Sequence, residues 1–210
     1  RIKKKIKGKV LSLLSGGGGN DNYWHWMFDV LPRFNICESV VRLDKIDFFL
    51  LPDNKRRFQT ETLEILEIPK KKQISSVSFR HIISDELYVT NHPVMLTNNA
   101  TNDIQNMPRW ISEWLKKKFI KNENKNLNFS KKIYIDREDS TSNVKHLRSI
   151  INEKEIKQFL LKEGFQIIKL GNLHFNDQVL AFNNADIIVG LHGAGFANLP
   201  FCKPNTKIVE

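Results

Sequence analysis

The sequence predicts an α/β protein with two parallel sheets, and three observations support this. Short apolar segments alternate with amphipathic helical patterns, which is typical of parallel strands joined by crossover helices. The alternation occurs twice, and the polar run KNENKNLNFSKK, residues 121–132, separates the two halves. A chain of 210 residues that is 40% hydrophobic can bury a substantial core. We therefore expect two Rossmann-like lobes.

The N-terminal half alternates strands with helices. The apolar segments KVLSLLS, DFFLLP and ELYVTN predict strands at residues 9–15, 47–52 and 86–91. A helix is expected from about Trp24 to Val41, and FQTETLEILEI, residues 58–68, fits an amphipathic helix. We assign residues 1–107 to an N-terminal lobe.

A helix and a linker follow the first lobe. In PRWISEWLKKKF, Pro108 stands near a helix start, and Ile111, Trp114 and Leu115 share one face. The polar run comes next and has the composition of a linker. We assign residues 108–130 to a bridging helix and linker.

The C-terminal half has a βαβαβ pattern. Its predicted strands and helices are KKIYIDRE (131–138), NEKEIKQFLLKEGF (152–165), QIIKL (166–170), NDQVLAFNNA (176–185), DIIVGL (186–191) and TKIV (206–209). Ile156, Phe159 and Leu160 form the expected buried stripe of the first helix, and Gly164 stands where a left-handed C-cap belongs. We expect residues 131–210 to form a second lobe that is incomplete, because the last strand pattern is cut short.

The charge balance favours phosphate-bearing partners. Lys and Arg number 33 against 23 Asp and Glu, a formal net charge of +10. This balance suits nucleotides, nucleic acid or an anionic membrane surface. The lysine runs 3–5, 70–72 and 116–118 are interpreted first as solvated faces. A non-enzymatic basic α/β module that binds nucleic acid or another polyanion is therefore one functional hypothesis.

The number of cysteines and the hydropathy of the sequence indicate the cellular compartment of the protein. Cys37 and Cys202 lie far apart and show no metal-ligand or CxxC spacing, so a reducing compartment is expected. No apolar run in the sequence approaches the length of a membrane span, and the basic N-terminus lacks the apolar core of a signal peptide. The chain opens at Arg1 without a Met, so we expect a fragment. We expect a cytoplasmic protein, peripheral at the inner face of the membrane.

The segment IIVGLHGAGFANL places an HGAG sequence directly after a strand. Gly193 and Gly195 allow a tight turn with exposed amides at a helix start, which favours an anion such as phosphate. His192 adds a hydrogen-bond donor. Two alternatives are that the glycines only allow close packing, and that HGAG is the oxyanion loop of an esterase. The second lacks a GxSxG nucleophile in this sequence.

The segment NYWHWMFDVLPRF follows the first strand and four glycines. His25 and Asp29 are four residues apart on the expected helix, so the carboxylate can orient the imidazole, which then suits a general base. The alternative is that His25 is a buried structural histidine. Tyr23, Trp24 and Trp26 offer aromatic platforms for a sugar or a nucleobase, or else pack in the core.

Five segments in order resemble glycosyltransferase family 61: NYWHWMFDVLPRF, YIDRE, RSIINEKE, FNDQV and GLHGAGFANLPF. The resemblance implies a GT-B-like fold, in which two Rossmann-like lobes with parallel sheets surround a central cleft. It also implies an inverting transfer of a sugar from a nucleotide-sugar donor to a glycan or polysaccharide acceptor hydroxyl. The N-terminal lobe is then the acceptor side, and the C-terminal lobe binds the donor.

The Lys, Asn and Ile bias indicates an AT-rich genome, so we expect a role in bacterial surface polysaccharide biosynthesis. Because eukaryotic members of the family are secretory-pathway enzymes, the alternative is a secretory-pathway enzyme whose N-terminal anchor is missing.

Carried over to this sequence, the resemblance implies a set of donor-binding residues: Arg137, Arg148, Asn152, Glu153, His192, Gly193, Ala194 and Gly195. Arginine, histidine and helix amides can stabilise the negative charge of a departing nucleotide diphosphate. Asn152 and Glu155 also have the spacing of a capping box, which explains part of NEKE by helix initiation alone. Phe196 and Ala197 stand where the family more often has Leu-Thr.

An inverting transfer needs a base near the acceptor hydroxyl. His25 is the first candidate, and Asp29 is either its partner or the base itself. The expected acceptor-binding residues are Tyr23, Trp24, Trp26 and Arg33, where Arg33 supports the acceptor or is a surface contact. The segment DRED, residues 136–139, lacks the DxD spacing of metal-dependent transferases, so we expect no divalent metal and no cofactor. The expected partners are a nucleotide sugar, a glycan or lipid-linked saccharide acceptor, and an anionic membrane at the periphery.

Overall fold

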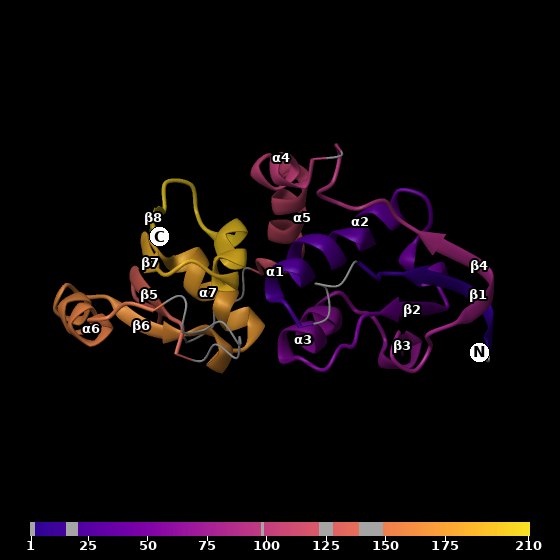
Figure 1. Cartoon of the computed structure of the whole chain (residues 1–210), viewed down its shortest axis with the longest axis horizontal. Coiled ribbons are helices and arrows are strands. Elements are labelled where there is room, and N and C mark those ends of the chain that lie inside the picture. Colours follow the sequence, from indigo (N-terminus) through magenta and orange to yellow (C-terminus); the bar gives the residue numbers. More distant parts are fainter. Residues whose placement is uncertain (1–2, 16–20, 98, 122–127, 139–148) are drawn as a thin grey trace. The chain divides into compact units, whose positions relative to one another are not determined.

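The structure is a computed structural model that divides into two compact units. It describes residues 3–15, 21–97, 99–121, 128–138 and 149–210. The units comprise residues 1–118 and 119–210 (Figure 1). Their border falls inside the stretch 108–130 that the sequence assigns to a bridging helix and linker, and the three domain ranges remain predictions.

The first unit contains a sheet of four parallel strands. Their order is β3-β2-β1-β4, with β1 at Lys4–Ser12, β2 at Phe48–Leu51, β3 at Gln73–Ser75 and β4 at Ile82–Val89. The strands predicted from apolar runs are confirmed. The sequence did not predict β3, because three residues are too few to show an alternating pattern.

One helical run connects β1 to the segment before β2. It consists of α1 (Tyr23–His25), a π-helical turn (Trp26–Val30) and α2 (Pro32–Glu38). The Asn22 side chain accepts a hydrogen bond from the Trp24 amide at 2.9 Å and so caps the run. The Leu31 amide donates to the Trp26 carbonyl at 3.0 Å, the i to i+5 bond of a π-helix. The expected helix from Trp24 to Val41 is thus confirmed, with an irregular turn inside it.

Three further α-helices belong to the rest of the first unit, the last of them ending at the border. They are α3 (Arg57–Ile65), α4 (Ala100–Gln105) and α5 (Arg109–Phe119). The sequence did not predict α4, since its six residues carry almost no apolar periodicity. The predicted apolar face of α5 is confirmed, because Ile111, Trp114 and Leu115 are all buried.

The helical run packs on α3 and on the sheet through its aromatic residues. Trp26 is fully buried, and its indole N–H donates to Thr62 Oγ1 at 2.9 Å. The rings of Phe34 and Phe49 lie 5.7 Å apart, which joins α2 to β2. Burial of this much aromatic area fixes the helical run on the sheet and thereby fixes the polar face that it presents.

The second unit repeats the parallel arrangement. Its strands are ordered β6-β5-β7-β8, at Gln166–Lys169 (β6), Lys132–Asp136 (β5), Ile187–Gly190 (β7) and Lys207–Val209 (β8). The helices α6 (Glu153–Lys162) and α7 (Phe175–Asn184) alternate with them. Two parallel sheets with helices confirm the predicted α/β fold class, which is that of GT-B-like, Rossmann-type lobes.

Helix α6 shows one correct and one wrong prediction. Gly164 follows it with φ +81°, and the Phe165 amide donates to the Leu160 carbonyl at 2.9 Å, as a left-handed C-cap requires. Leu160 is buried, but Phe159 is 60% exposed, so its place in the buried stripe is wrong. Consecutive helical residues are about 100° apart, and with Leu160 facing inward Phe159 turns toward solvent.

The HGAG segment leads into a 3₁₀-helix, Ala194–Phe201, and not into an α-helix. The last residue of this helix joins an aromatic cluster in the second unit. Phe119 lies 5.0 Å from Phe175 and 6.4 Å from Phe201, measured between ring centroids. This cluster anchors the far end of the segment that follows β7.

Candidate functional site

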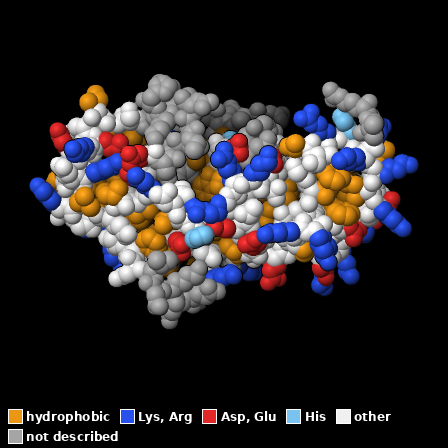
Figure 2. All heavy atoms as spheres, turned by 90° about the horizontal axis from the view of Figure 1, so that it is seen from below, with side chains coloured by type: hydrophobic (Ala, Val, Ile, Leu, Met, Phe, Trp, Pro, Cys, Tyr) orange, Lys and Arg blue, Asp and Glu red, His pale blue; other side chains and the backbone are white. Residues whose placement is uncertain are grey.

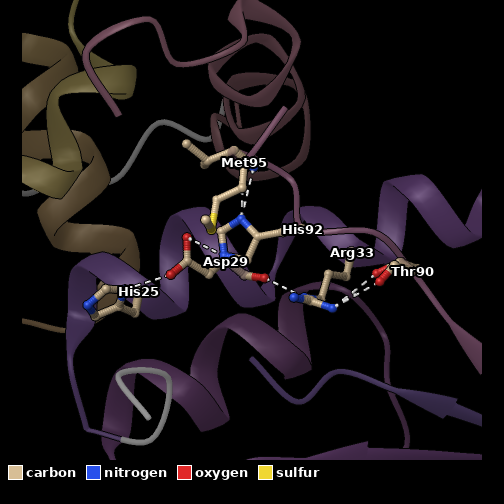
Figure 3. A network of polar contacts seen from close by, with 7 residues as sticks. His25, Asp29, Arg33, Thr90, His92 and Met95 are labelled. Carbon is tan, nitrogen blue, oxygen red and sulfur yellow. Dashed lines mark hydrogen bonds and ion pairs between the residues drawn. The ribbon is translucent and has the colours of Figure 1, made fainter. Parts of the chain in front are cut away.

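His25 and Asp29 lie in contact on the polar face of the helical run. His25 Nδ1 is 2.6 Å from Asp29 Oδ2, as their spacing predicts (Figure 3). The histidine side chain is 40% exposed and the carboxylate 13% exposed. The pair therefore combines an accessible imidazole with a sheltered carboxylate that fixes the ring.

His92 completes this cluster and was not predicted from the sequence. It follows β4, and its Nε2 lies 3.6 Å from Asp29 Oδ1 (Figure 3). Its Nδ1 accepts hydrogen bonds from the amides of Val94 at 3.3 Å and Met95 at 3.1 Å. A signal was available in the sequence: His92 stands just after a predicted strand, at the edge where the carboxyl ends of parallel strands meet.

Burial lowers the pKa of His92 below its ordinary value. Asp29 opposes this shift, while Arg33 and His25 add to it and Asp103 opposes it weakly. Because desolvation disfavours the imidazolium form, burial favours the neutral ring of His92.

Arg33 is a buried residue that supports the His25–Asp29–His92 cluster through hydrogen bonds. It is only 5% exposed, so the predicted alternative of a surface contact is wrong. Its Nε donates to the Asp29 carbonyl at 2.7 Å, and its Nη1 donates to the carbonyl and hydroxyl of Thr90 at 3.3 Å (Figure 3). Burial lowers the pKa of Arg33, and Asp29 opposes that shift. The guanidinium ties the helical run to the segment that carries His92.

The aromatic residues near His25 fall into two groups. Trp26 is fully buried against Thr62, so a ligand platform at Trp26 is wrong and its role is core packing. Tyr23 and Trp24 are half-buried, with Tyr23 edge-on to Phe58 at 5.1 Å and Trp24 tilted on Phe28 at 4.3 Å. Of the three predicted aromatic platforms, Tyr23 and Trp24 keep exposed surface and Trp26 does not.

In the second unit, the structure brings Arg137, His192 and Gly193 together beyond β5 and β7. Arg137 Nη1 donates to the His192 carbonyl at 2.5 Å. A Cβ on Gly193 would lie 3.1 Å from the Arg137 guanidinium carbon, and a Cβ on Gly195 would lie 2.9 Å from Leu170 Cδ1. Gly193 has φ 166°, which is extended backbone, so close side-chain approach is what requires glycine there. At Gly195, close packing against Leu170 is enough to explain why a glycine is required.

The His192 side chain is 71% exposed, and its Nδ1 lies 2.6 Å from Glu210 Oε1. Beneath the loop, the buried Asn198 amide donates to Gln178 Oε1 at 3.1 Å and to the Gly195 carbonyl at 3.2 Å. Gln178 in turn donates to the Leu170 carbonyl at 3.0 Å. This pair of buried amides fixes the HGAG loop, and the sequence reasoning missed both residues.

A second charged cluster lies at the end of β5. Asp136 is 3% exposed and pairs with Lys157 Nζ at 2.9 Å, and Lys157 also lies 3.3 Å from Glu153 Oε1. Tyr134 donates to Glu153 Oε1 at 3.1 Å, and burial together with Glu153 raises the Tyr134 pKa to about 12. Desolvation lowers the pKa of Lys157, but the hydrogen bonds to Asp136 and Glu153 outweigh it and the net shift is upward. Glu153 is therefore already held by two partners.

Other predicted donor residues have mixed outcomes. The Asn152 side chain lies 3.5 Å from Glu155 Oε2, but within the described residues it caps no backbone amide of α6, so the capping box is wrong. Ala194 begins the 3₁₀-helix that follows Gly193. Arg148, like Asp139 of DRED, lies outside the described residues.

The described residues give two findings on metals and membranes. They contain no group of three or more His, Cys, Asp or Glu that could hold a metal ion. None of the described helices combines the length and the apolar character that crossing a bilayer requires.

The lysine runs are partly used within the protein. Lys72 Nζ donates to the Ile46 carbonyl at 2.5 Å, and Lys118 pairs with Glu38 at 3.7 Å. Figure 2 shows Lys and Arg side chains spread over the visible face, with Asp and Glu between them. On this face the basic charge does not gather into one continuous patch, and membrane contact remains a prediction.

A family comparison matches nearly the whole chain: the model of the family Glycosyltransferase 61 matches residues 23–209. One curated relative is a beta-1,2-xylosyltransferase from Arabidopsis thaliana, 30% identical in an alignment of length 95 that covers 37% of this chain. The aligned part amounts to 18% of that relative, so the chain corresponds to a small part of its length.

Proposed function

Because the chain belongs to glycosyltransferase family 61, we propose that it transfers a sugar from a nucleotide-sugar donor to a hydroxyl of a glycan acceptor, with inversion and without a divalent metal. The observation that carries this proposal is the His25–Asp29 contact at 2.6 Å, with a ring that is 40% exposed. The family match covers both this pair and the HGAG loop. The net charge of +10 further supports anionic partners, including a membrane that carries a lipid-linked acceptor.

We assign the base to His25 and the orienting role to Asp29. Both carboxylate oxygens of Asp29 face histidine nitrogens, whereas the Nε2 of His25 points away from that carboxylate (Figure 3). In the proposed step, His25 Nε2 takes the proton of the acceptor hydroxyl as its oxygen attacks the anomeric carbon. The bond to the nucleotide diphosphate breaks, and the diphosphate leaves with the electron pair. Tyr23 and Trp24 are the proposed stacking surfaces for the acceptor.

The second unit is proposed to bind the donor through Arg137, His192 and the amides that follow Gly193. The guanidinium and the amides can offset the charge that develops on the diphosphate. Glu153 remains the candidate for a ribose hydroxyl, held in place by Lys157.

A thermal-shift screen tests the proposed donor class. The chain is heated with UDP, GDP, CMP and their common sugar conjugates, with and without EDTA, and UDP-xylose is included because one relative is a xylosyltransferase. A nucleotide at about 100 times its Kd stabilises the fold by about 2.7 kcal/mol, a rise in Tm of roughly 5–10 °C. We expect this rise with one nucleotide diphosphate, unchanged by EDTA. Stabilisation only by nucleic acid, fading as salt rises, would instead favour the basic binding module.

Gly193→Ala is expected to weaken nucleotide binding about tenfold while leaving the fold intact. The added Cβ meets Arg137 at 3.1 Å and must displace its guanidinium, whereas the extended backbone suits any residue. The matched control is Gly164→Ala, which has open space around it but φ +81°. That control should lose about 1 kcal/mol of stability and keep nucleotide affinity. Titration of each variant with the selected nucleotide separates the two effects, and equal affinities would contradict the assignment of Arg137.

A further inference from the structure

We propose that His92 is a positioning residue for the proposed transfer: its ring N–H faces one oxygen of the Asp29 carboxylate and favours the orientation in which the other oxygen stays on His25. The inference rests on the proposed function for its effect on turnover, but the geometry concerns the cluster itself. Three side chains from two distant segments meet at Asp29 (Figure 3).

The hydrogen bonds of His92 fix where its proton lies. Its Nδ1 accepts from the amides of Val94 and Met95, at 3.3 and 3.1 Å, so this nitrogen carries no proton. The proton of the neutral ring is therefore on Nε2, which lies 3.6 Å from Asp29 Oδ1, beyond direct hydrogen-bond distance but close enough for electrostatic attraction to the carboxylate. The turn after β4 thus presents an N–H to the carboxylate.

The buried position of His92 favours this arrangement. Burial lowers the pKa of His92, and the neutral ring keeps Nδ1 available to the two amides. The charged groups that face it are Asp29, Arg33 and His25 of the helical run, together with Asp103 of α4. Asp29 therefore has a neutral N–H near Oδ1 and the His25 ring at Oδ2.

Arg33 and His92 restrain different parts of Asp29. Arg33 Nε holds the Asp29 carbonyl at 2.7 Å, which fixes the backbone but leaves the carboxylate free to rotate. The terminal torsion of an aspartate is broad, so the orientation of the carboxylate depends on the contacts of its two oxygens. His25 contacts Oδ2 at 2.6 Å, and His92 lies near Oδ1.

Two substitutions separate this role from simple support of the turn. His92→Asn keeps an acceptor near the Nδ1 position for the Val94 and Met95 amides but loses the donor toward Asp29. His92→Gln keeps a donor near the Nε2 position but loses the acceptor. The measurement is the tautomer of His25 in the free protein, read from its ¹⁵N ring shifts at a pH where the ring is neutral, followed by kcat of transfer.

The wild type is expected to carry the His25 proton on Nδ1, donated to Asp29. His92→Asn should lose this preference and lower kcat about tenfold, while His92→Gln should retain both. The opposite result, in which His92→Asn keeps the His25 tautomer and kcat while His92→Gln loses them, would show that His92 only supports the turn. That result would overturn the proposal. If the Asn variant does not fold, the Gln variant decides alone, and loss of the Nδ1–H tautomer in it overturns the proposal. Since the tautomer is read without substrate, a wild type that shows it but transfers no sugar refutes the proposed function and not this inference.

Discussion

Replacing His25 with asparagine is expected to lower kcat of sugar transfer by about 10²–10⁴-fold, the usual contribution of a positioned general base. The asparagine side chain retains a donor near the Nδ1 position that faces Asp29 at 2.6 Å, so the contact that holds the site is kept. It lacks the Nε2 atom that the proposed reaction uses. The loss should therefore fall on the chemical step, and binding of the nucleotide should be unchanged.

The measurement is single-turnover transfer with the donor that the thermal-shift screen selects, together with the nucleotide-induced rise in Tm. His81→Asn is the matched control, because His81 is exposed and belongs to the same unit. It should transfer at the wild-type rate. A His25→Asn variant with wild-type kcat would assign the base to another group, and Asp29→Asn would then be the variant to measure.

Arg137→Ala is expected to lower kcat/KM about 10²–10³-fold, the scale for removal of one donor that stabilises a developing charge. Arg137 is held against Gly193 and donates to the His192 carbonyl at 2.5 Å, so its guanidinium has a defined place beyond β5. Arg137→Lys should recover only part of the loss, since an ammonium keeps the charge without the planar fork. The nucleotide-induced rise in Tm should shrink in the same order.

Lys132→Ala is the control for Arg137, because it removes one positive charge from the other end of the same strand. It should cost nothing in kcat/KM, although it removes a bond to the Glu163 carbonyl. Equal losses in the Ala variants of Arg137 and Lys132 would indicate that net charge alone attracts the donor. Such a result would contradict a specific role for Arg137.

The sequence predicted those parts of the fold that local periodicity encodes. The apolar runs of β1, β5 and β7 and the i, i+4 spacing of His25 and Asp29 are local patterns, and the structure contains them. The short strand β3 has no such pattern, and neither does the place of His92 beside Asp29. Both depend on how distant segments meet, which periodicity does not report.

Burial of individual side chains was the least predictable property. Trp24 and Trp26 face nearly opposite sides of the helical run, about 200° apart, and only the packing of Trp26 on α3 shows which of the two is fully buried. Similarly, Asn198 and Gln178 have ordinary polar side chains in the sequence. Only the packed structure shows that they are buried and bonded to each other.

The π-helical turn Trp26–Val30 has a consequence for the comparison of sequences within the family. It holds one residue more than an α-helical turn of the same length, so the residues before and after it are out of step by about 100°. A relative that buries the same faces of a regular helix here would need one residue fewer. A gapless alignment of such a relative would be out of register on one side of the turn. Alignments across this turn should therefore be fixed from both sides, with any one-residue gap placed between Trp26 and Leu31.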